Sequence, residues 1–437
     1  MGKWADTHKT ASGTRLVEME LWLFLVLVAI TLVLVVALWS VTRTRRVDLA
    51  VHGVDSLREA LPSIAGATHG TLLPGNRVEV LQNGDGFFPP LLADIAAARK
   101  SIHIESYVWW KGDICHRVAT ALAEKARAGV KVRLLVDASG SAKMERKLVT
   151  MMRDAGCEVR RYRPLRISNL GRMNRRDHRK IAVFDGRIGY VFGHGIAEEW
   201  VGHGQDEKHW RDTGARLEGP IVGALQSAFS ENWTEETGEV LAGLDYFPHL
   251  APVGNVPTHL AYYFDSGSVS SVDLLFRLAF ASARHELLIA NPYLAIDEDV
   301  STLLQKAARR GVDVKLMLPG EVTDVQAVRH AGHFLYGNLL ESGVEIYEFQ
   351  PTLNHQKIVV VDGLWSHIGS TNLDNRSFEL SDEISLGILD EKTAAELRAA
   401  FQDDLRRCVR IDYKEWRARA LTHKLRYWSS YRFKELL

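Results

Sequence analysis

Two patterns of hydrophobic and polar positions alternate along most of the chain. Apolar residues recur at helical spacing in four stretches, residues 88–100, 118–128, 269–284 and 300–310. Short runs of Val, Ile and Leu, typical of strands buried on both faces, occupy residues 101–107, 130–136 and 181–184. Gly129 and Gly311 stop two of the expected helices. Strands that alternate with helices predict an α/β protein whose sheet carries helices on its faces.

One segment near the N-terminus departs from both patterns. Residues 21–39 contain no charged residue, no Gly and no Pro, and an apolar run of about 20 residues can span a bilayer as a helix. A core helix would carry a polar face, and a signal peptide would have a shorter apolar region of about 7–15 residues. Trp22 and Trp39 stand near the two ends, where aromatic rings favour the membrane interface. We therefore expect a retained single-pass transmembrane helix over residues 21–41.

The chain after this segment repeats itself. Four sequence matches occur in the same order, pairing residues 98–107 with 283–293, 129–136 with 311–318, 156–159 with 343–346, and 178–186 with 355–363. Four matches in one order are hard to attribute to chance, so the repeat predicts two similar α/β domains. We place their boundary near residue 250, in a stretch that contains Pro and Gly, and expect the domains to pack face to face as one body.

The expected layout follows from these segments. It comprises an N-terminal tail (1–20), the transmembrane helix (21–41), a linker (42–70), a first domain (71–250), a second domain (251–412) and a basic, aromatic C-terminal tail (413–437). Arg43, Arg45 and Arg46 cluster directly after the apolar run, and by the positive-inside rule this favours a cytoplasmic location for the two domains.

Composition narrows the classes of function. Lys+Arg and Asp+Glu are both 54, so the formal net charge is zero, which weighs against nucleic acid as the main partner. The three cysteines form no Cys-x-x-Cys pair, which suggests neither a disulfide framework nor a zinc site. His194, His203 and His209 lie close in sequence but without the spacing of a metal site. We therefore expect no metal and no cofactor.

The last pair of matching segments carries the candidate chemistry. Each contains His-x-Lys-x4-Asp, as His178, Lys180 and Asp185 in the first half and as His355, Lys357 and Asp362 in the second. Displacement at a phosphodiester needs a nucleophile, a proton donor for the leaving alkoxide and positive charge near the phosphoryl oxygens. Two histidines supply the first two and two lysines the third, without a metal.

The spacing adds geometry to this interpretation. In a strand, residues two apart share a face, so each His and its Lys are expected to point the same way. Asp185 and Asp362 are expected to orient a histidine of the opposite half. A lone motif fits an ordinary strand end, but two motifs at equivalent points of a repeat predict one shared active site.

Two segments carry a family resemblance. They are residues 354–390, NHQKIVVVDGLWSHIGSTNLDNRSFELSDEISLGILD, and residues 209–220, HWRDTGARLEGP. The chain resembles the phospholipase D superfamily from about residue 72 to residue 410, and within it the bacterial cardiolipin synthases. This implies two α/β/α sandwich domains packed as a pseudo-dimer behind the N-terminal helix. It also implies phosphate-binding roles for Gly369, Ser370 and Asn372, an acidic position at Glu105, and a branch-specific Glu383.

The stretch after the first motif departs from the family pattern. Relatives usually have Gly-Gly-x-Asn there, whereas this chain has Phe192-Gly193-His194-Gly195. Phe192 stands in place of the first Gly and Gly195 in place of the Asn. Gly193 is kept, and His194 is the expected substitute for the lost phosphate donor. The alternative is that phosphate contacts depend mainly on the second half.

The resemblance implies a two-step reaction through a phosphohistidine, with His178 as nucleophile and His355 as acid and base. The implied substrate is phosphatidylglycerol, both as phosphatidyl donor and as acceptor, and glycerol leaves. Hydrolysis by a phospholipase D or nuclease, and a catalytically silent membrane scaffold, remain alternatives. The membrane is an expected partner, the bacterial inner membrane is the expected location, and no obligate protein partner is evident.

Two basic segments have more than one interpretation. Residues 166–176 carry four arginines before the first motif, which fits a contact with lipid headgroups as well as a solvated loop. Residues 414–437 interleave Lys and Arg with Trp, Tyr and Phe. An amphipathic helix on an anionic membrane and a helix packed on the second domain are equally supported.

Overall fold

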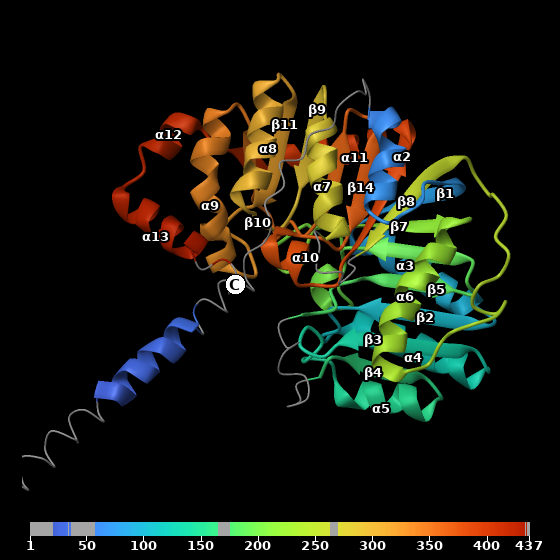
Figure 1. Ribbon diagram of the computed structural model, residues 1–437. Coiled ribbons are helices and arrows are strands. Elements are labelled where there is room, and N and C mark those ends of the chain that lie inside the picture. The colour runs from blue at the N-terminus through green and yellow to red at the C-terminus, as the bar shows by residue number, and fades with distance from the viewer. Residues whose placement is uncertain are drawn as a thin grey trace, which may run out of the picture. The chain divides into compact units, whose positions relative to one another are not determined.

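The computed structural model describes residues 21–33, 35, 57–164, 175–262, 270–432 and 434. From Leu57 onward, the described residues form one compact body, and residues 21–33 form a helix that is a unit of its own. The body has two halves, coloured light blue to green and yellow to red in Figure 1. The predicted boundary near residue 250 falls in the connection between these halves, but it does not separate two independent bodies.

The elements of the two halves follow the repeat. The first half contains β1 (Leu73–Gln82), α3 (Asn83–Ala97), β2 (Ser101–Ser106), α4 (Asp113–Arg127), β3 (Lys131–Asp137), α5 (Arg146–Asp154), β4 (Glu158–Tyr162), β5 (Ile181–Phe184), β6 (Ile188–Phe192), the 3₁₀ turn η2 (Glu198–Trp200), β7 (Thr213–Glu218) and α6 (Ile221–Thr237).

The second half repeats this order with additions. It contains β8 (Val256–Tyr262), α7 (Ser271–Ser282), β9 (Glu286–Ala290), β10 (Leu294–Ala295), α8 (Glu298–Arg309), β11 (Asp313–Pro319), α9 (Gln326–Glu341), β12 (Glu345–Phe349), β13 (Ile358–Val361), β14 (Trp365–Gly369), β15 (Leu373–Asp374), α10 (Asn375–Glu379), β16 (Ile384–Leu389), α11 (Glu391–Leu405), β17 (Cys408–Arg410), α12 (Tyr413–Arg417) and α13 (Leu421–Arg432). The helices and strands expected from the apolar patterns are confirmed to within a few residues at most ends.

One continuous sheet runs through both halves. Its strand order is β17-β12-β11-β9-β13-β14-β16-β8-β1-β7-β6-β5-β2-β3-β4. Read outward from the central pair β8 and β1, the two halves present equivalent strands in the same order. β1 and β8 pair antiparallel, with Leu73 opposite Thr258 and Asn76 opposite Val256. The two sheets therefore join edge to edge, a contact that the expected face-to-face packing did not include.

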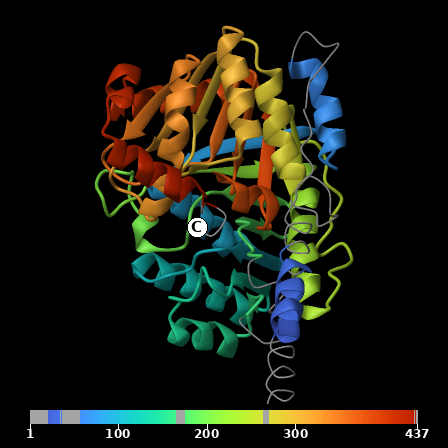
Figure 2. The ribbon, with the colours of Figure 1, turned by 60° about the vertical axis from the view of Figure 1, so that its left-hand side comes forward.

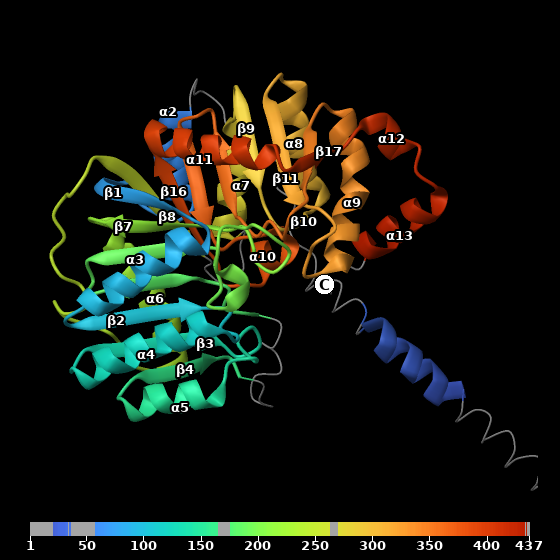
Figure 3. The same cartoon turned by 180° about the vertical axis from the view of Figure 1, so that it is seen from behind.

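Helices cover both faces of the sheet, which explains why the strands are apolar throughout. Ala182 and Phe184 of β5 belong to the hydrophobic cluster that includes α3, α4 and α5, whereas Ile181 and Val183 belong to the cluster that includes α6. In the second half α7, α8 and α9 cover one face, and α11 lies on the other (Figures 1 and 3). The cluster containing α6 also holds residues of β13, β14, β16 and α11, so the halves share part of their core.

The predicted linker is partly a structured element of the body. Helix α2 (Leu57–Ala67) lies within residues 42–70 and buries Leu57, Leu61 and Ile64 in the cluster that includes α7. The linker predicted over residues 42–70 therefore includes a helix, residues 57–67, that packs against the second half. The apolar spacing of these buried positions, four and three residues apart, is the helical signal that the sequence contained.

The predicted transmembrane helix falls only partly on described residues. Residues 21–33 are helical and expose their apolar side chains, whereas residues 34 and 36–41 lie outside the described residues. Within the part of the chain that the structure describes, no helix combines the length and the apolar character that crossing a bilayer requires. Residues 165–174, which hold most of the basic insert, are also outside the described residues.

Candidate active site

The two His-x-Lys motifs meet where the halves cross each other. Asp177 forms a β-bridge with Asp382, and Asn354 forms one with Arg211. The His178 amide donates to the Asp382 carbonyl at 2.9 Å, and the His355 amide donates to the Arg211 carbonyl at 2.8 Å. Each histidine is therefore fixed by the segment that leads into β7 or β16 of the opposite half. The prediction that both motifs contribute to one site agrees with this geometry.

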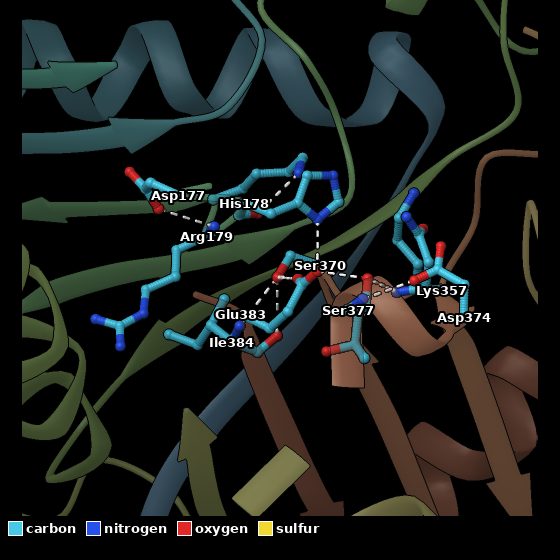
Figure 4. A network of polar contacts seen from close by, with 12 residues as sticks. Asp177, His178, Arg179, Lys357, Ser370, Asp374, Ser377, Glu383 and Ile384 are labelled. Atoms are coloured by element: carbon cyan, nitrogen blue, oxygen red, sulfur yellow. Dashed lines mark hydrogen bonds and ion pairs between the residues drawn. The ribbon is translucent and has the colours of Figure 1, made fainter. Parts of the chain in front are cut away.

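A carboxylate from the second half holds the histidine of the first. His178 Nδ1 lies 2.8 Å from Glu383 Oε1, as Figure 4 shows. Ser377 donates to the same oxygen at 2.7 Å, and Ser370 donates to Glu383 Oε2. Because Nδ1 is occupied by the carboxylate, Nε2 is the nitrogen left for a substrate.

The reverse arrangement holds His355. Its Nδ1 lies 2.7 Å from Oδ2 of Asp212, a first-half residue that is fully buried. Trp200 Nε1 donates to Asp212 Oδ2 at 2.8 Å, and the Thr213 amide donates to Oδ1 at 2.8 Å. Asp212 and Glu383 both stand directly before equivalent strands, β7 and β16, so they are counterparts in the repeat.

The two lysines fold back onto their own histidines. Lys180 Nζ donates to the His178 carbonyl at 2.9 Å. Lys357 Nζ donates to the His355 carbonyl at 2.7 Å and lies 2.8 Å from Nδ1 of the same ring. All four side chains come directly before a strand and not within it. His178 and Lys180 precede β5, and His355 and Lys357 precede β13.

Burial sets the charge states of this group. It lowers the pKa of Lys180 to about 7, with a further contribution from the charge of Lys357. It lowers the pKa of Lys357 to about 8, against the opposing effect of Asp212. The pKa of His178 falls well below its usual range through burial and then through Lys180 and Lys357. His178 is therefore a neutral imidazole near pH 7, the form that can attack phosphorus.

The two supporting carboxyl groups differ in acidity. Burial raises the pKa of Glu383 to about 7, although Lys180 and the hydroxyls of Ser370 and Ser377 act in the opposite direction. Burial would also raise the pKa of Asp212, but the neighbouring His194, His355 and Lys357 outweigh it and hold that pKa below its usual range. His355 therefore faces a permanent negative charge, and His178 faces a carboxyl group that is half protonated near pH 7.

The aspartates of the motifs lie elsewhere, and the expectation that they orient a histidine was wrong. The Asp185 carboxylate accepts from the amides of Arg99, Lys100 and Ser101, at the start of β2. Asp362 accepts from Arg284, His285 and Glu286 at the start of β9. Each aspartate lies five positions along the strand from the lysine of its motif, a distance of about 16 Å. The histidines are held instead by Glu383 and Asp212.

Each aspartate also begins a tight hairpin turn. Asp185 and Gly186 have φ of 53° and 64°, and Asp362 and Gly363 have φ of 53° and 63°. Two successive residues with positive φ are what a type I′ turn requires, and Asp-Gly is a preferred pair for it. The aspartate of each motif thus turns the chain from β5 to β6, or from β13 to β14, and ties that turn to the start of β2 or β9, the antiparallel neighbour of β5 or β13.

Replacing this aspartate is expected to reduce stability first. Asp185→Ala removes three charge-assisted hydrogen bonds and places alanine at positive φ, so we expect the free energy of unfolding to fall by about 2–4 kcal/mol. Urea denaturation of the detergent-solubilised protein measures this, with the exposed Asp154→Ala as control. An Asp185→Ala variant with normal stability but no turnover would contradict this structural role and indicate that Asp185 takes part in catalysis.

The predicted phosphate-binding residues separate into two groups. Asn372 is 7% exposed, and its Oδ1 has no hydrogen-bond partner, so its carboxamide remains a candidate phosphate contact. Ser370 is wholly buried and bonds to Glu383, and it also accepts from the Ile384 amide. Its role in this structure is to fix Glu383.

The altered stretch after the first motif is explained by packing around Asp212. A Cβ at Gly193 would lie 2.1 Å from Asp212 Oδ1, so only glycine fits beside that carboxylate. His194 is fully buried and stacks on Phe87 with ring centroids 4.3 Å apart. This burial argues against the predicted contact between His194 and a phosphate. In the second half, a Cβ at Gly369 would meet the Ile384 carbonyl at 2.4 Å.

Glu105 lies buried in β2, in the first half. It accepts from Asn232 Nδ2 at 2.7 Å and has its pKa raised to about 7 by burial. No hydrogen bond links it to either histidine in the described structure. Within the described residues, no group of three or more His, Cys, Asp or Glu side chains is arranged to hold a metal ion.

Sequence reasoning overlooked several side chains around the histidines. Asp212 was visible only as part of a resemblance, yet the repeat aligns it with Glu383, and that alignment could have identified it. Aromatic rings line both histidines: Tyr107 contacts His178 at 4.7 Å between centroids, and Trp200 and Trp210 contact His355 at 5.2 and 5.7 Å. No sequence pattern distinguishes these rings from ordinary core residues.

Comparison with known proteins assigns the chain to a family. A sequence profile described as "Cardiolipin synthase, PLD-like domain" matches residues 91–199 and 277–405. The cardiolipin synthase of Geobacillus kaustophilus is 35% identical over 347 residues, which cover 79% of this chain and 69% of that protein. The chain belongs to the cardiolipin synthase family of phospholipase D-like proteins. Cardiolipin synthase A of Pseudomonas fluorescens is 34% identical over 355 residues, 81% of this chain and 73% of that protein.

Solved structures confirm the fold. Phosphatidylserine synthase of Haemophilus influenzae Rd KW20 superposes with a TM-score of 0.62 at 14% identity, over 86% of this chain and all of that one. Polyphosphate kinase of Porphyromonas gingivalis superposes with a TM-score of 0.54 at 15% identity, over 85% of this chain and 52% of that one. The sequence profile and the curated relatives show that the chain is a phospholipase D-superfamily enzyme, and they confirm the resemblance to cardiolipin synthases.

Proposed function

We propose that this enzyme transfers a phosphatidyl group from one phosphatidylglycerol molecule to another, forming cardiolipin and releasing glycerol. The observation that carries the proposal is the pairing of two histidines, His178 partly buried and His355 buried, with carboxylates from opposite halves, in a chain of this family. No metal is needed, because the two lysines beside the histidines supply positive charge for the phosphoryl oxygens.

The first step breaks the bond between phosphorus and the glycerol headgroup oxygen of the donor. Nε2 of His178 attacks phosphorus, and His355 gives a proton to the departing glycerol. The ionised Asp212 supports this role, because a permanent negative charge at Nδ1 stabilises the imidazolium form of His355. Glu383, near neutrality, balances a positive ring less well, which favours His178 as the nucleophile.

The second step reverses the roles of the proton donor and acceptor. His355, now neutral, takes the proton from a headgroup hydroxyl of a second phosphatidylglycerol, and that oxygen attacks the phosphohistidine. The P–N bond breaks and His178 is regenerated. Water in place of the second lipid would give phosphatidic acid, so transfer depends on keeping water out while an acceptor is bound.

Product analysis tests the proposal. Detergent-purified enzyme is incubated with phosphatidylglycerol, and the lipids are identified by mass spectrometry. We expect cardiolipin and free glycerol in equal amounts. Phosphatidic acid without cardiolipin would show that the enzyme is a hydrolase. If a correctly folded protein formed neither lipid, the catalytically silent scaffold would be the remaining interpretation.

The lysines predict an alkaline loss of activity. A lysine is charged below its pKa, so kcat/KM should fall as pH rises through the range of about 7 to 8 in which Lys180 and Lys357 lose their protons. Lys180→Arg keeps its charge there and should move the fall toward the Lys357 range. A pH–rate profile measures both enzymes, and an unchanged profile in the variant would contradict the assignment.

The location belongs to the same proposal. Residues 21–41 would anchor the enzyme in a bacterial inner membrane with the two halves on the cytoplasmic side, where a lipid substrate is at hand. The unbroken apolar run and the arginines that follow it support this. No protein partner is required by the proposed reaction.

A further inference from the structure

The C-terminal tail folds into a helix with two different apolar faces. Tyr427 and Tyr431 of α13 are buried against the second half, and Figures 1 and 2 show α13 beside α9 as the outermost helix there. Leu421, Leu425 and Trp428, spaced by four and three residues, share another face and are 82%, 66% and 50% exposed. The packed-helix interpretation of the tail is therefore confirmed for one face and leaves the other uncovered.

The uncovered face forms a groove rather than scattered apolar positions. Phe334 of α9, itself 37% exposed, joins α13 there, and the groove has a volume of about 530 Å³. Its lining consists of Phe334, Leu421, Thr422, Lys424, Leu425 and Trp428. Contiguous exposed apolar surface bordered by charge marks an interaction site.

The charge on α13 has one sign. Helix α13 carries Lys424, Arg426 and Arg432, which are exposed, and residues 421–432 contain no acidic residue. A second copy pairing through this helix would place basic residues against basic residues. An anionic lipid surface instead complements both features, because acyl chains accept the leucines and the tryptophan while lipid phosphates attract the cations.

The groove is linked to the active site through short contacts. Tyr431 Oη and Lys434 Nζ both donate to the Ile296 carbonyl, at 3.2 and 2.8 Å. Ile296 directly follows β10, and β10 pairs with β15, which begins next to Asn372. A surface that held α13 would therefore also hold the part of the second half that carries β15 and Asn372.

We propose that the exposed face of α13, formed by Leu421, Leu425 and Trp428 with Phe334 of α9, docks on the anionic surface of a lipid bilayer. This contact is additional to the predicted N-terminal helix and positions the two halves at the source of the substrate. Only the suggested purpose of this contact, access to the lipid substrate, rests on the proposed function. The contact itself is tested by lipid binding, which is measured without turnover.

A site-specific probe tests the contact in the full-length protein. An environment-sensitive fluorophore is attached to Leu425→Cys, and the protein is reconstituted in phosphatidylcholine vesicles with or without phosphatidylserine, containing lipids with a shallow quencher. We expect quenching that strengthens with the anionic lipid. The same probe on Leu244→Cys, another exposed leucine at 62%, is the control and should not be quenched. The labelling background replaces Cys408, which is only partly buried, with Ser.

Two outcomes would overturn the proposal. Absence of quenching at position 425 in anionic vesicles would show that this face does not meet the bilayer. Cross-linking of position 425 to the same position of a second molecule, without quenching, would show a self-association surface. Lys424→Glu should weaken the anionic-lipid dependence about fivefold, whereas Lys125→Glu on α4 should not.

Enzyme assays separate this contact from the reaction itself. Leu425→Ser combined with Trp428→Ser should slow turnover of vesicle-borne phosphatidylglycerol but keep wild-type turnover in mixed detergent micelles, where no surface must be held. Equal loss in both assays would indicate a structural defect and contradict a docking role. If the wild-type enzyme makes no cardiolipin in either assay, the proposed function fails, while the quenching result still decides the docking surface.

Discussion

His178→Ala and His355→Ala are each expected to lower turnover by about 10⁴-fold or more, because a nucleophile and its proton donor act as a unit. Cardiolipin formation from phosphatidylglycerol measures the loss. His203→Ala, at a histidine with 69% side-chain exposure, is the control and should retain wild-type activity. Full activity in either of the first two variants would contradict the shared site.

The same pair of variants assigns the roles. A phosphatidyl ester of p-nitrophenol has a leaving group that departs without a proton donor. His355→Ala should therefore still release one burst of p-nitrophenolate and retain a phosphatidyl adduct on His178, detectable by mass spectrometry of peptides. His178→Ala should give neither. An adduct on His355 in the His178→Ala enzyme would reverse the assignment of nucleophile and acid.

Asp212→Asn is expected to reduce turnover by about 10³-fold, since the amide keeps the size of the side chain but removes the charge that supports protonated His355. Burial and then Lys357 lower the pKa of His355, and Asp212 opposes that shift, so loss of the Asp212 charge should also move the pH limb that belongs to His355 toward still lower pH. The pH dependence of kcat measures both effects.

The chain offers a matched control for this change. Asp206 and His209 form an exposed pair with an oxygen–nitrogen distance of 2.7 Å, the same as in the Asp212–His355 pair. Asp206→Asn should leave turnover unchanged. Thermal unfolding of both variants checks the fold, and an Asp212→Asn enzyme that lost activity only in proportion to unfolded protein would reduce Asp212 to a structural residue.

Local signals in the sequence were sufficient for the helices and strands. Residues 181–184 form a strand buried on both faces, as their unbroken apolar run predicted, and Gly129 and Gly311 follow helices with φ of 89° and 92°. Such features depend on a few neighbouring residues, so they can be recognised without the fold. The interpretation of Asp185 was wrong because Asp-Gly is also a turn signal, and in the structure this pair forms the turn after β5.

Residue order alone identifies the chain as a repeated α/β protein with two equivalent His-x-Lys motifs, because a repeat and a motif are properties of that order. Which carboxylates hold the two histidines depends on the tertiary structure. Glu383 reaches His178 and Asp212 reaches His355 because each half inserts the segment before its own β7 or β16 strand into the other half. The residues in these two contacts are 205 and 143 positions apart in the sequence. Hydrophobic periodicity is a local property of the chain, so it does not predict contacts over such separations.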